Sequence, residues 1–287
     1  MSVSLSVWLF AASIVASALG GALGMASGIF IVPVLTLFAG TGFRTAVAAS
    51  IVSVIACSSA SAAPFLRNGV TNLRLALVLE VATTLGALTG VLLTGSLPVP
   101  FLYVLFAAVL AVSAWQMMAR RNKTARADEL ADPRDWSTLL HLHSGYQDPG
   151  SGHPRSYVVR RLPAGLALMY GAGVISALLG IGSGVLKIPA MDTVLQLPLK
   201  VSSATSNFMI GVTAAASGVA YFFLGDIDPK IAGPVALGSV LGALIGARLL
   251  MAISGRWLRI LFVVTLIALA LQMLLAAAGV GPTRRLV

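Results

Sequence analysis

Long apolar stretches separated by short polar breaks fill almost the whole chain. Four uninterrupted runs cover residues 75–95, 101–119, 232–253 and 258–279. Each has the length of about 20 residues that a helix needs to cross the hydrocarbon core of a bilayer. The pattern therefore predicts an all-α integral membrane protein with about 8–10 membrane segments.

The two halves of the chain share one pattern of small and helix-breaking residues without a gap. The halves match when the chain is shifted along itself by the 156 positions that separate Gly24 from Gly180. Apolar composition alone would not keep aligning Gly, Pro and Ser, so we predict two homologous repeats, roughly 5–119 and 161–279. We accordingly divide the chain into a membrane repeat at 1–120, a hydrophilic linker at 121–160 and a second membrane repeat at 161–287. The matched pairs include Gly24 with Gly180, Ser27 with Ser183, Gly28 with Gly184, Pro33 with Pro189, Ser50 with Ser206, Gly86 with Gly242 and Gly90 with Gly246.

The first segment of each repeat is too long for one straight helix. Residues 5–39 would span roughly 50 Å, against about 30 Å of hydrocarbon. We predict a break at 24–28 and at 180–184, because glycine leaves helical geometry at low steric cost. If the piece after the break does not cross the bilayer, each repeat has four crossings and the repeats are parallel. If it does cross, each has five and the repeats are inverted, which is the form we favour.

Composition and charge narrow the class of protein. The chain is 58% hydrophobic and only 10% charged, which leaves too few polar side chains to cover a water-facing surface. Its net charge of +10 does not indicate nucleic-acid binding, because many basic residues gather in the linker. A basic loop of this kind is typical of the cytoplasmic side. We predict a multi-pass protein of the cell inner (plasma) membrane with a cytoplasmic 121–160 loop.

The glycine breaks are the first candidate site. Main-chain amides freed inside a membrane need partners, and the start of the following half-helix offers donors and a positive dipole end to an anion. Close helix packing through small residues is the alternative, but recurrence of the break in both repeats favours function. The residues concerned are Gly24, Ser27 and Gly28 in the first repeat and Gly180, Gly182, Ser183 and Gly184 in the second.

Polar residues in the next helix of each repeat are the second candidate site. Ser50 and Ser53 in the first repeat, and Thr205, Ser206 and Asn207 in the second, can bind anion oxygens without carrying charge into the membrane. Alternatively they cap a helix or bond neighbouring helices.

Three charges lie inside predicted spans. Lys187 follows the second break and either contacts an anion, reaches to an interface or pairs with Asp192. For Glu80 and Arg248 we expect structural pairing.

The linker holds all three histidines, His141, His143 and His153. No Cys or further close ligand completes a metal site there, so we predict no metal and no cofactor. Residues 156–159 read as a strand of a small hairpin. No Asp pair or Ser/His pair lies within the apolar runs, which argues against an enzyme.

These features resemble the TauE/SafE family of membrane proteins, exporters associated with sulfite and organosulfonates. The resemblance covers nearly the whole chain. It rests on the duplicated break with its downstream proline, on the Ala48-Ala49-Ser50 and Ala204-Thr205-Ser206 elements, and on the paired Gly86/Gly90 and Gly242/Gly246 motifs. It implies transport of a small, often sulfur-containing anion by a secondary mechanism.

The residues and the resemblance together favour a secondary transporter, acting as an exporter of a small anion such as sulfite or an organosulfonate. In it the two glycine breaks form the site at the repeat interface. A non-catalytic membrane subunit or an anion channel that needs a partner protein is the alternative. A coupling proton or sodium ion and a homodimer stay open as partners beside the anion and the lipid bilayer.

Overall fold

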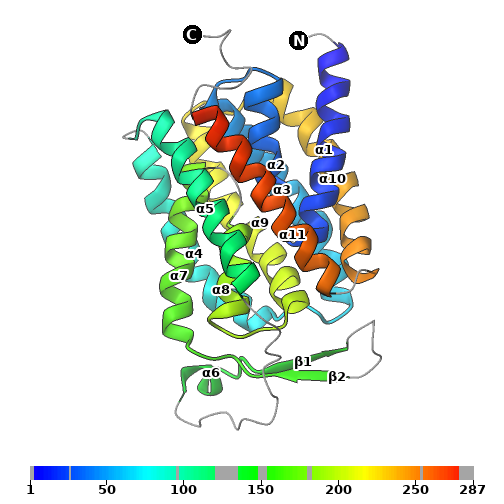
Figure 1. The fold of residues 1–287 in the computed structure, drawn as a ribbon, viewed down its shortest axis with the longest axis vertical. Helices are drawn as coiled ribbons and strands as arrows, with labels where there is room; N and C mark the ends of the chain where they lie inside the picture. The colour runs from blue at the N-terminus through cyan, green and yellow to red at the C-terminus, as the bar shows by residue number, and fades with distance from the viewer. Residues whose placement is uncertain are drawn as a thin grey trace.

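A helical bundle carrying one small two-stranded sheet makes up the structure (Figure 1). The computed structural model describes residues 3–25, 27–94, 97–119, 135–147, 154–179, 183–252 and 255–277. Gly180, Gly182, His153 and half of the 121–160 linker lie outside these residues. The elements are α1 (Val3–Leu23), α2 (Gly28–Pro33), η1 (Val34–Phe38), α3 (Phe43–Arg67), α4 (Leu73–Thr94), α5 (Val99–Ala119), α6 (Trp136–Leu139), β1 (Ser144–Gln147), β2 (Pro154–Tyr157), α7 (Leu162–Leu179), α8 (Gly184–Thr193), α9 (Leu199–Phe223), α10 (Pro229–Ala252) and α11 (Gly255–Ala277).

Six helices within the described residues are long and apolar enough to cross a membrane. They are Ser4–Leu23, Phe43–Arg67, Leu73–Leu93, Leu162–Leu179, Leu199–Phe223 and Pro229–Leu249. The helices α5 and α11 add 21 and 23 residues to the bundle. The prediction of a helical multi-pass membrane protein is confirmed, and the full number of segments stays a prediction.

The first helix of each half ends at the glycine-rich segment where the sequence predicted a break. Helix α1 ends at Leu23 and α2 begins at Gly28, while α7 ends at Leu179 and α8 begins at Gly184. Gly24 has a φ of +77°, a left-handed conformation that an L side chain rarely adopts. After this break the chain turns back, because Ser27 lies beside Ser53 and Gly28 beside Ser50, so that α2 runs antiparallel to α3.

Glycine ridges hold two helix pairs that join opposite halves of the chain. Helix α1 packs chiefly on α10, and α4 on α7. A Cβ added to Gly238, Gly242 or Gly246 of α10 would overlap carbonyl oxygens along α1, and one added to Gly86 of α4 would overlap the Tyr170 carbonyl of α7. Such close backbone approach through small residues is a common way to associate helices in lipid.

The two ends of the bundle differ. Figure 1 shows α1 beginning and α11 ending at one end, whereas β1, β2 and α6 lie at the other end, where α7 begins. Helices α1 and α7 therefore run in opposite directions along the bundle. We name the two ends the terminus side and the hairpin side.

The sheet is a short antiparallel hairpin in which Ser144 pairs with Tyr157 and Gln147 with Pro154. Its second strand begins two residues earlier than the sequence predicted. Asn72 ties the hairpin to the bundle: its side chain caps α4 by accepting from the Leu75 amide at 3.1 Å and donates to the Leu142 carbonyl at 2.8 Å.

Candidate functional site

The two helix breaks meet inside the bundle. A Cβ built on Gly184, the first residue of α8, would lie 2.7 Å from Met25 Cα and 3.1 Å from the Gly24 carbonyl oxygen. A Cβ built on Gly24 would lie 2.5 Å from Ser203 Cβ on α9. Glycine is therefore required at both positions, at Gly24 for its conformation as well as for space. The breaks form a single region, with α8 and α9 of the second half against the end of α1.

Hydroxyls of the first half are satisfied by bonds between helices. Ser53 of α3 lies 2.5 Å, oxygen to oxygen, from both Ser27 before α2 and Ser239 of α10. Ser50 donates to the Gly28 carbonyl at 3.4 Å. Ser50 and Ser53 lie in the second and third turns of α3, so they do not cap this helix, and their hydroxyls bond between helices. Their part in anion binding stays a prediction.

In the second half, two polar residues of α9 also bond to neighbouring helices. The Thr205 hydroxyl accepts a hydrogen bond from the Asn72 amide at 3.1 Å. The Asn207 side-chain nitrogen donates to the Gly21 carbonyl of α1 at 3.4 Å, and the backbone carbonyl of Asn207 accepts from the Ser58 hydroxyl of α3. This part of α9 therefore joins three other helices.

Around the same region, five buried polar atoms have no hydrogen-bond partner among the described residues. None of their side chains is more than 1% exposed. A buried donor or acceptor without a partner costs roughly 1–3 kcal/mol, so such a cluster is unusual unless something else binds there. The atoms are Ser183 Oγ, Ser202 Oγ, Ser203 Oγ, Ser206 Oγ and Asn207 Oδ1.

The sequence prediction covered three of these residues but missed Ser202 and Ser203. The signal was present, because the hydroxyl-rich segment of α9 begins at Ser202 rather than at Ala204. Ser203 gains its importance from the contact with Gly24, 179 positions away, which no local pattern indicates.

Lys187 lies fully buried in the first turns of α8 and pairs with Glu80 of α4. Its Nζ donates to Glu80 Oε2 at 3.0 Å and to the Thr213 hydroxyl of α9 at 2.8 Å. The other Glu80 oxygen accepts from Thr213 and, at 3.2 Å, from Thr84. The interpretation of Lys187 as reaching an interface or pairing with Asp192 is wrong, since its partner comes from another helix. The expected pairing of Glu80 is confirmed, whereas Arg248 lies exposed on α10.

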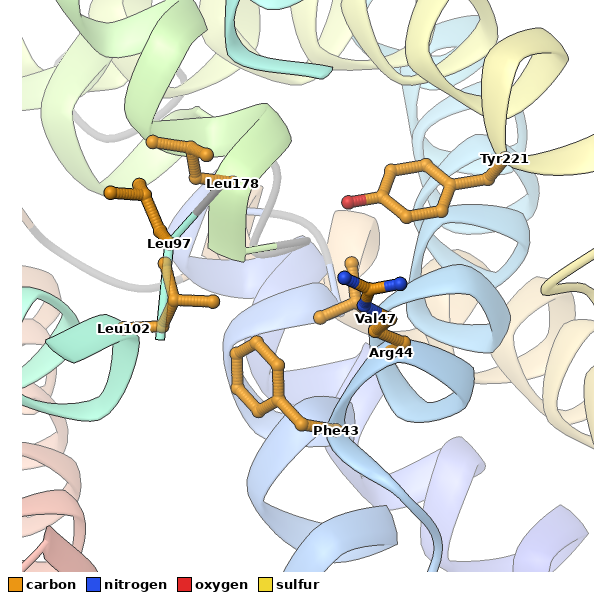
Figure 2. A pocket seen from close by; sticks show the side chains of 7 residues that line it. All are labelled: Phe43, Arg44, Val47, Leu97, Leu102, Leu178 and Tyr221. Carbon is orange, nitrogen blue, oxygen red and sulfur yellow. The ribbon is translucent and has the colours of Figure 1, made fainter. Parts of the chain in front are cut away.

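A small cavity of about 20 Å³ opens near the second break (Figure 2). Its lining is apolar except for Arg44 in the first turn of α3 and Tyr221 near the end of α9, whose hydroxyl donates to the Ala177 carbonyl at 3.0 Å. Leu178, in the last turn of α7, carries the lining up to the second break. Arg44 was not among the predicted site residues, because only the fold brings it to α7. The full lining is Phe43, Arg44, Val47, Leu97, Leu102, Leu178 and Tyr221.

The described histidines serve the hairpin side. The His143 Nδ1 accepts from the Val159 amide at 3.1 Å, and its Nε2 lies 3.0 Å from the Thr138 hydroxyl. Burial lowers the pKa of His143 below its ordinary value, partly opposed by the negative charge of Asp135. His141 is exposed with a φ of +50°. Within the described part of the chain, no group of three or more His, Cys, Asp and Glu is placed to hold a metal.

A bundle of apolar helices with opposed broken helices and a polar region at their meeting point defines a multi-pass membrane protein of the transporter class. The sequence model of the sulfite exporter TauE/SafE family matches residues 9–273 of this chain. Because this match covers most of the chain, the protein belongs to the TauE/SafE family of membrane transporters.

Relatives in two bacteria carry transporter names. The chain is 22% identical to the probable membrane transporter protein YunE of Bacillus subtilis over 250 residues, 85% of this chain and 88% of YunE. It is 25% identical to the probable membrane transporter protein YdhB of the same organism over 231 residues, 79% of this chain and 83% of YdhB. It is 30% identical to the probable membrane transporter protein MamO of Paramagnetospirillum magneticum over 189 residues, 59% of this chain but 28% of MamO. No solved structure matches the chain.

Proposed function

We propose that this chain is a secondary transporter that exports a small anion, such as sulfite or an organosulfonate, bound where the two helix breaks meet. The observation that carries the proposal is the cluster of polar atoms on Ser183, Ser202, Ser203, Ser206 and Asn207 that have no hydrogen-bond partner within the described part of the chain. Four hydroxyl donors and one amide oxygen suit an oxyanion that carries a proton, such as hydrogen sulfite. The start of α8 adds the positive end of a ten-residue helix.

The remaining predicted residues fit this site in two ways. Gly24 and Gly184 let the helix ends approach each other, and we infer the same for Gly28. Gly180 and Gly182 lie outside the described residues and stay predictions. Ser27, Ser50, Ser53 and Thr205 hold the surrounding helices together through the bonds described above. In this arrangement the second half supplies most groups that contact the anion, and the first half frames them.

We further infer that the two membrane regions, 1–120 and 161–287, are inverted repeats. Helices α3 and α9 both have 25 residues, and α9 begins at Leu199, 156 positions after Phe43. The starts of α4 and α10, and of α5 and α11, are separated by the same interval. The opposite directions of α1 and α7 in Figure 1 support inversion. Exposure of the two breaks to alternate sides of the membrane would then follow from rocking of symmetric elements.

We infer that the hairpin side faces the cytoplasm and that the membrane is the plasma (inner) membrane, because the 121–160 linker is basic. The cavity beside Arg44 then opens toward the opposite, outer side. A membrane-impermeant thiol reagent should label an Arg160→Cys variant only from the cytoplasmic face. Labelling from the outer face alone would reverse the orientation.

Transport by the purified chain in proteoliposomes tests the function. Sulfite and sulfoacetate should show saturable counterflow, with taurine and acetate as comparison solutes. Ser183→Leu fills the space beside Gly184 and should abolish the flux. The matched control is Ala215→Leu, which adds the same side chain at an exposed position of α9 and should leave it unchanged.

Three results would contradict the proposal. Flux that rises linearly with concentration would indicate a channel. Silence of the well-folded chain with every anion would indicate a subunit that needs a partner. Normal flux in the Ser183→Leu variant would remove the meeting point of the breaks from the pathway.

A further inference from the structure

The buried pair of Lys187 and Glu80 joins the two halves of the chain. Lys187 belongs to α8, whereas Glu80 belongs to α4, 107 positions earlier. Thr213 of α9 touches both charged groups, and Thr84 touches the carboxylate. Lys187 is 0% exposed and the Glu80 side chain 7%, so water does not stabilise either charge.

The pair breaks the symmetry of the two halves. The positions that correspond to Lys187, Glu80 and Thr213 at the 156-residue offset carry Ile31, Ala236 and Cys57. The corresponding place in the other half is therefore apolar, which shows that the helices can pack there without charge. The helix packing therefore does not explain why charged residues occupy this place in one half.

Stability does not supply this explanation. Removing two charges from water is costly, and replacing a buried ion pair with apolar residues is often neutral or stabilising. Ionisable residues within membrane helices commonly mark ion or proton pathways. A carboxylate, an ammonium group and two hydroxyls within direct reach of one another form the components of such a site.

The pair also lies next to the meeting point of the breaks. Lys187 is one helical turn beyond Ser183, and its amide donates to the Ser183 carbonyl at 2.8 Å. The unpartnered Ser183 hydroxyl and the Lys187 side chain therefore start from the same turn of α8. A change in the partner of Lys187 therefore alters the charge next to the place where an anion would bind.

We propose that Glu80 and Lys187 couple anion transport to a proton, an inference that rests on the proposed function. A proton binds to a Glu80 carboxylate oxygen, the salt bridge opens, and the Lys187 ammonium becomes the counter-ion of the bound anion. On release, the anion leaves Lys187, the proton leaves Glu80 and the salt bridge re-forms. One proton and one monovalent anion move together, so the cycle is electroneutral, and export requires an outward anion gradient larger than the inward proton gradient.

The surroundings offer no competing partner in contact with the pair among the described residues. Helices α5 and α7, which pack against α8, each carry one tyrosine and no charged residue. The charges on the other neighbours are Lys200 in the first turn of α9, Arg74 in the first turn of α4 and Asp192, five residues beyond Lys187 on α8. Among the charged groups that the structure describes, Glu80 is the one that contacts Lys187.

The test uses the full chain in proteoliposomes with sulfite, an internal pH dye and the membrane potential clamped at zero. An imposed pH gradient should drive sulfite accumulation, and a sulfite gradient should move protons. Glu80→Gln should keep sulfite counterflow but reduce accumulation driven by the pH gradient at least about tenfold. Lys187→Met should weaken sulfite binding in counterflow. Asp192→Asn, a carboxylate change on the same helix, should leave proton coupling intact.

The outcomes separate this inference from the proposed function. Sulfite counterflow by the wild-type chain without any response to the pH gradient overturns proton coupling and leaves the transporter intact. Unchanged coupling in Glu80→Gln also overturns it. No flux of any anion by the wild-type chain refutes the proposed function instead. If Glu80→Gln does not fold, the wild-type proton movement on sulfite addition decides alone.

Discussion

Replacing Ser206 with alanine is expected to stabilise the empty protein and weaken anion binding at the same time. The Ser206 hydroxyl is fully buried and has no partner among the described residues. Its removal relieves a penalty of roughly 1–3 kcal/mol. The oxygen leaves a void of about 12 Å³, which costs only about 0.3 kcal/mol. The net stabilisation of about 1–2.5 kcal/mol corresponds to a rise of about 2–10 °C in the Tm, on the scale of soluble domains.

The loss of binding follows from the same hydroxyl. A hydrogen bond to a charged ligand is worth roughly 1.5–3 kcal/mol, so Kd for sulfite should rise about 10- to 150-fold. Thermal unfolding of the purified protein, with and without sulfite, measures both effects. The anion should raise the Tm of the wild-type chain and do so much less in the variant.

Ser53→Ala is the matched comparison, because it removes the same hydroxyl from a bonded position. Ser53 lies 2.5 Å from both Ser27 and Ser239, so its loss should lower stability by about 1–2 kcal/mol. Opposite signs for the two serine variants are the signature of a ligand site at Ser206. If Ser206→Ala destabilises the protein as Ser53→Ala does, the hydroxyl has a structural partner and the reasoning fails.

Three further predictions test the packing, the hairpin and the cavity. Gly242→Ala should prevent stable folding, because its Cβ would overlap the backbone of α1. A Cβ at Gly233 on the same helix meets nothing within 4 Å, so Gly233→Ala should be neutral or stabilising by up to about 1 kcal/mol. The yield of monodisperse protein in detergent compares the two variants. Because the folded pKa of His143 lies below its unfolded value, the hairpin should lose stability as pH falls through about 6.5 and toward the folded pKa. Hydrogen exchange of the described residues within 135–160 should show this loss as faster exchange at low pH. The pH dependence should vanish in His143→Gln. Arg44→Glu should slow anion uptake from the cavity side about tenfold at low ionic strength and little at high salt. The same charge reversal at the exposed Lys230 should have no effect of this size. Equal effects at the two positions would exclude a local role for the cavity.

Local sequence chemistry predicted the elements of this fold well. Apolar runs of sufficient length indicated the helices, and the breaks at 24–28 and 180–184 followed from a segment too long to be one helix. Lys187 was recognised as a charge that needs a partner or a cavity, because its cost in an apolar span does not depend on the fold. These inferences need only the residue and its neighbours along the chain.

Contacts between distant segments could not be predicted in the same way. Lys187 had Asp192 within reach along the helix, but the bundle brings Glu80 and Thr213 to it instead. Likewise, Ser50 and Ser206 occupy equivalent places in the predicted repeat and look alike in sequence, yet among the described residues the Ser50 hydroxyl bonds to the Gly28 carbonyl and the Ser206 hydroxyl has no partner. Which hydroxyl is satisfied depends on helix rotation and depth, which hydrophobic patterns do not fix.

The pairing of α1 with α10 has a consequence for the biogenesis of the protein. Helix α1 emerges from the ribosome long before α10, the helix that begins at Pro229 and carries the glycine ridge against which α1 packs. Until then its flank faces lipid or the insertion machinery rather than its native neighbour. A chain cut between the halves would lack the native partners of both α1 and α4, so grafting one half onto a relative must carry the matching ridge with it.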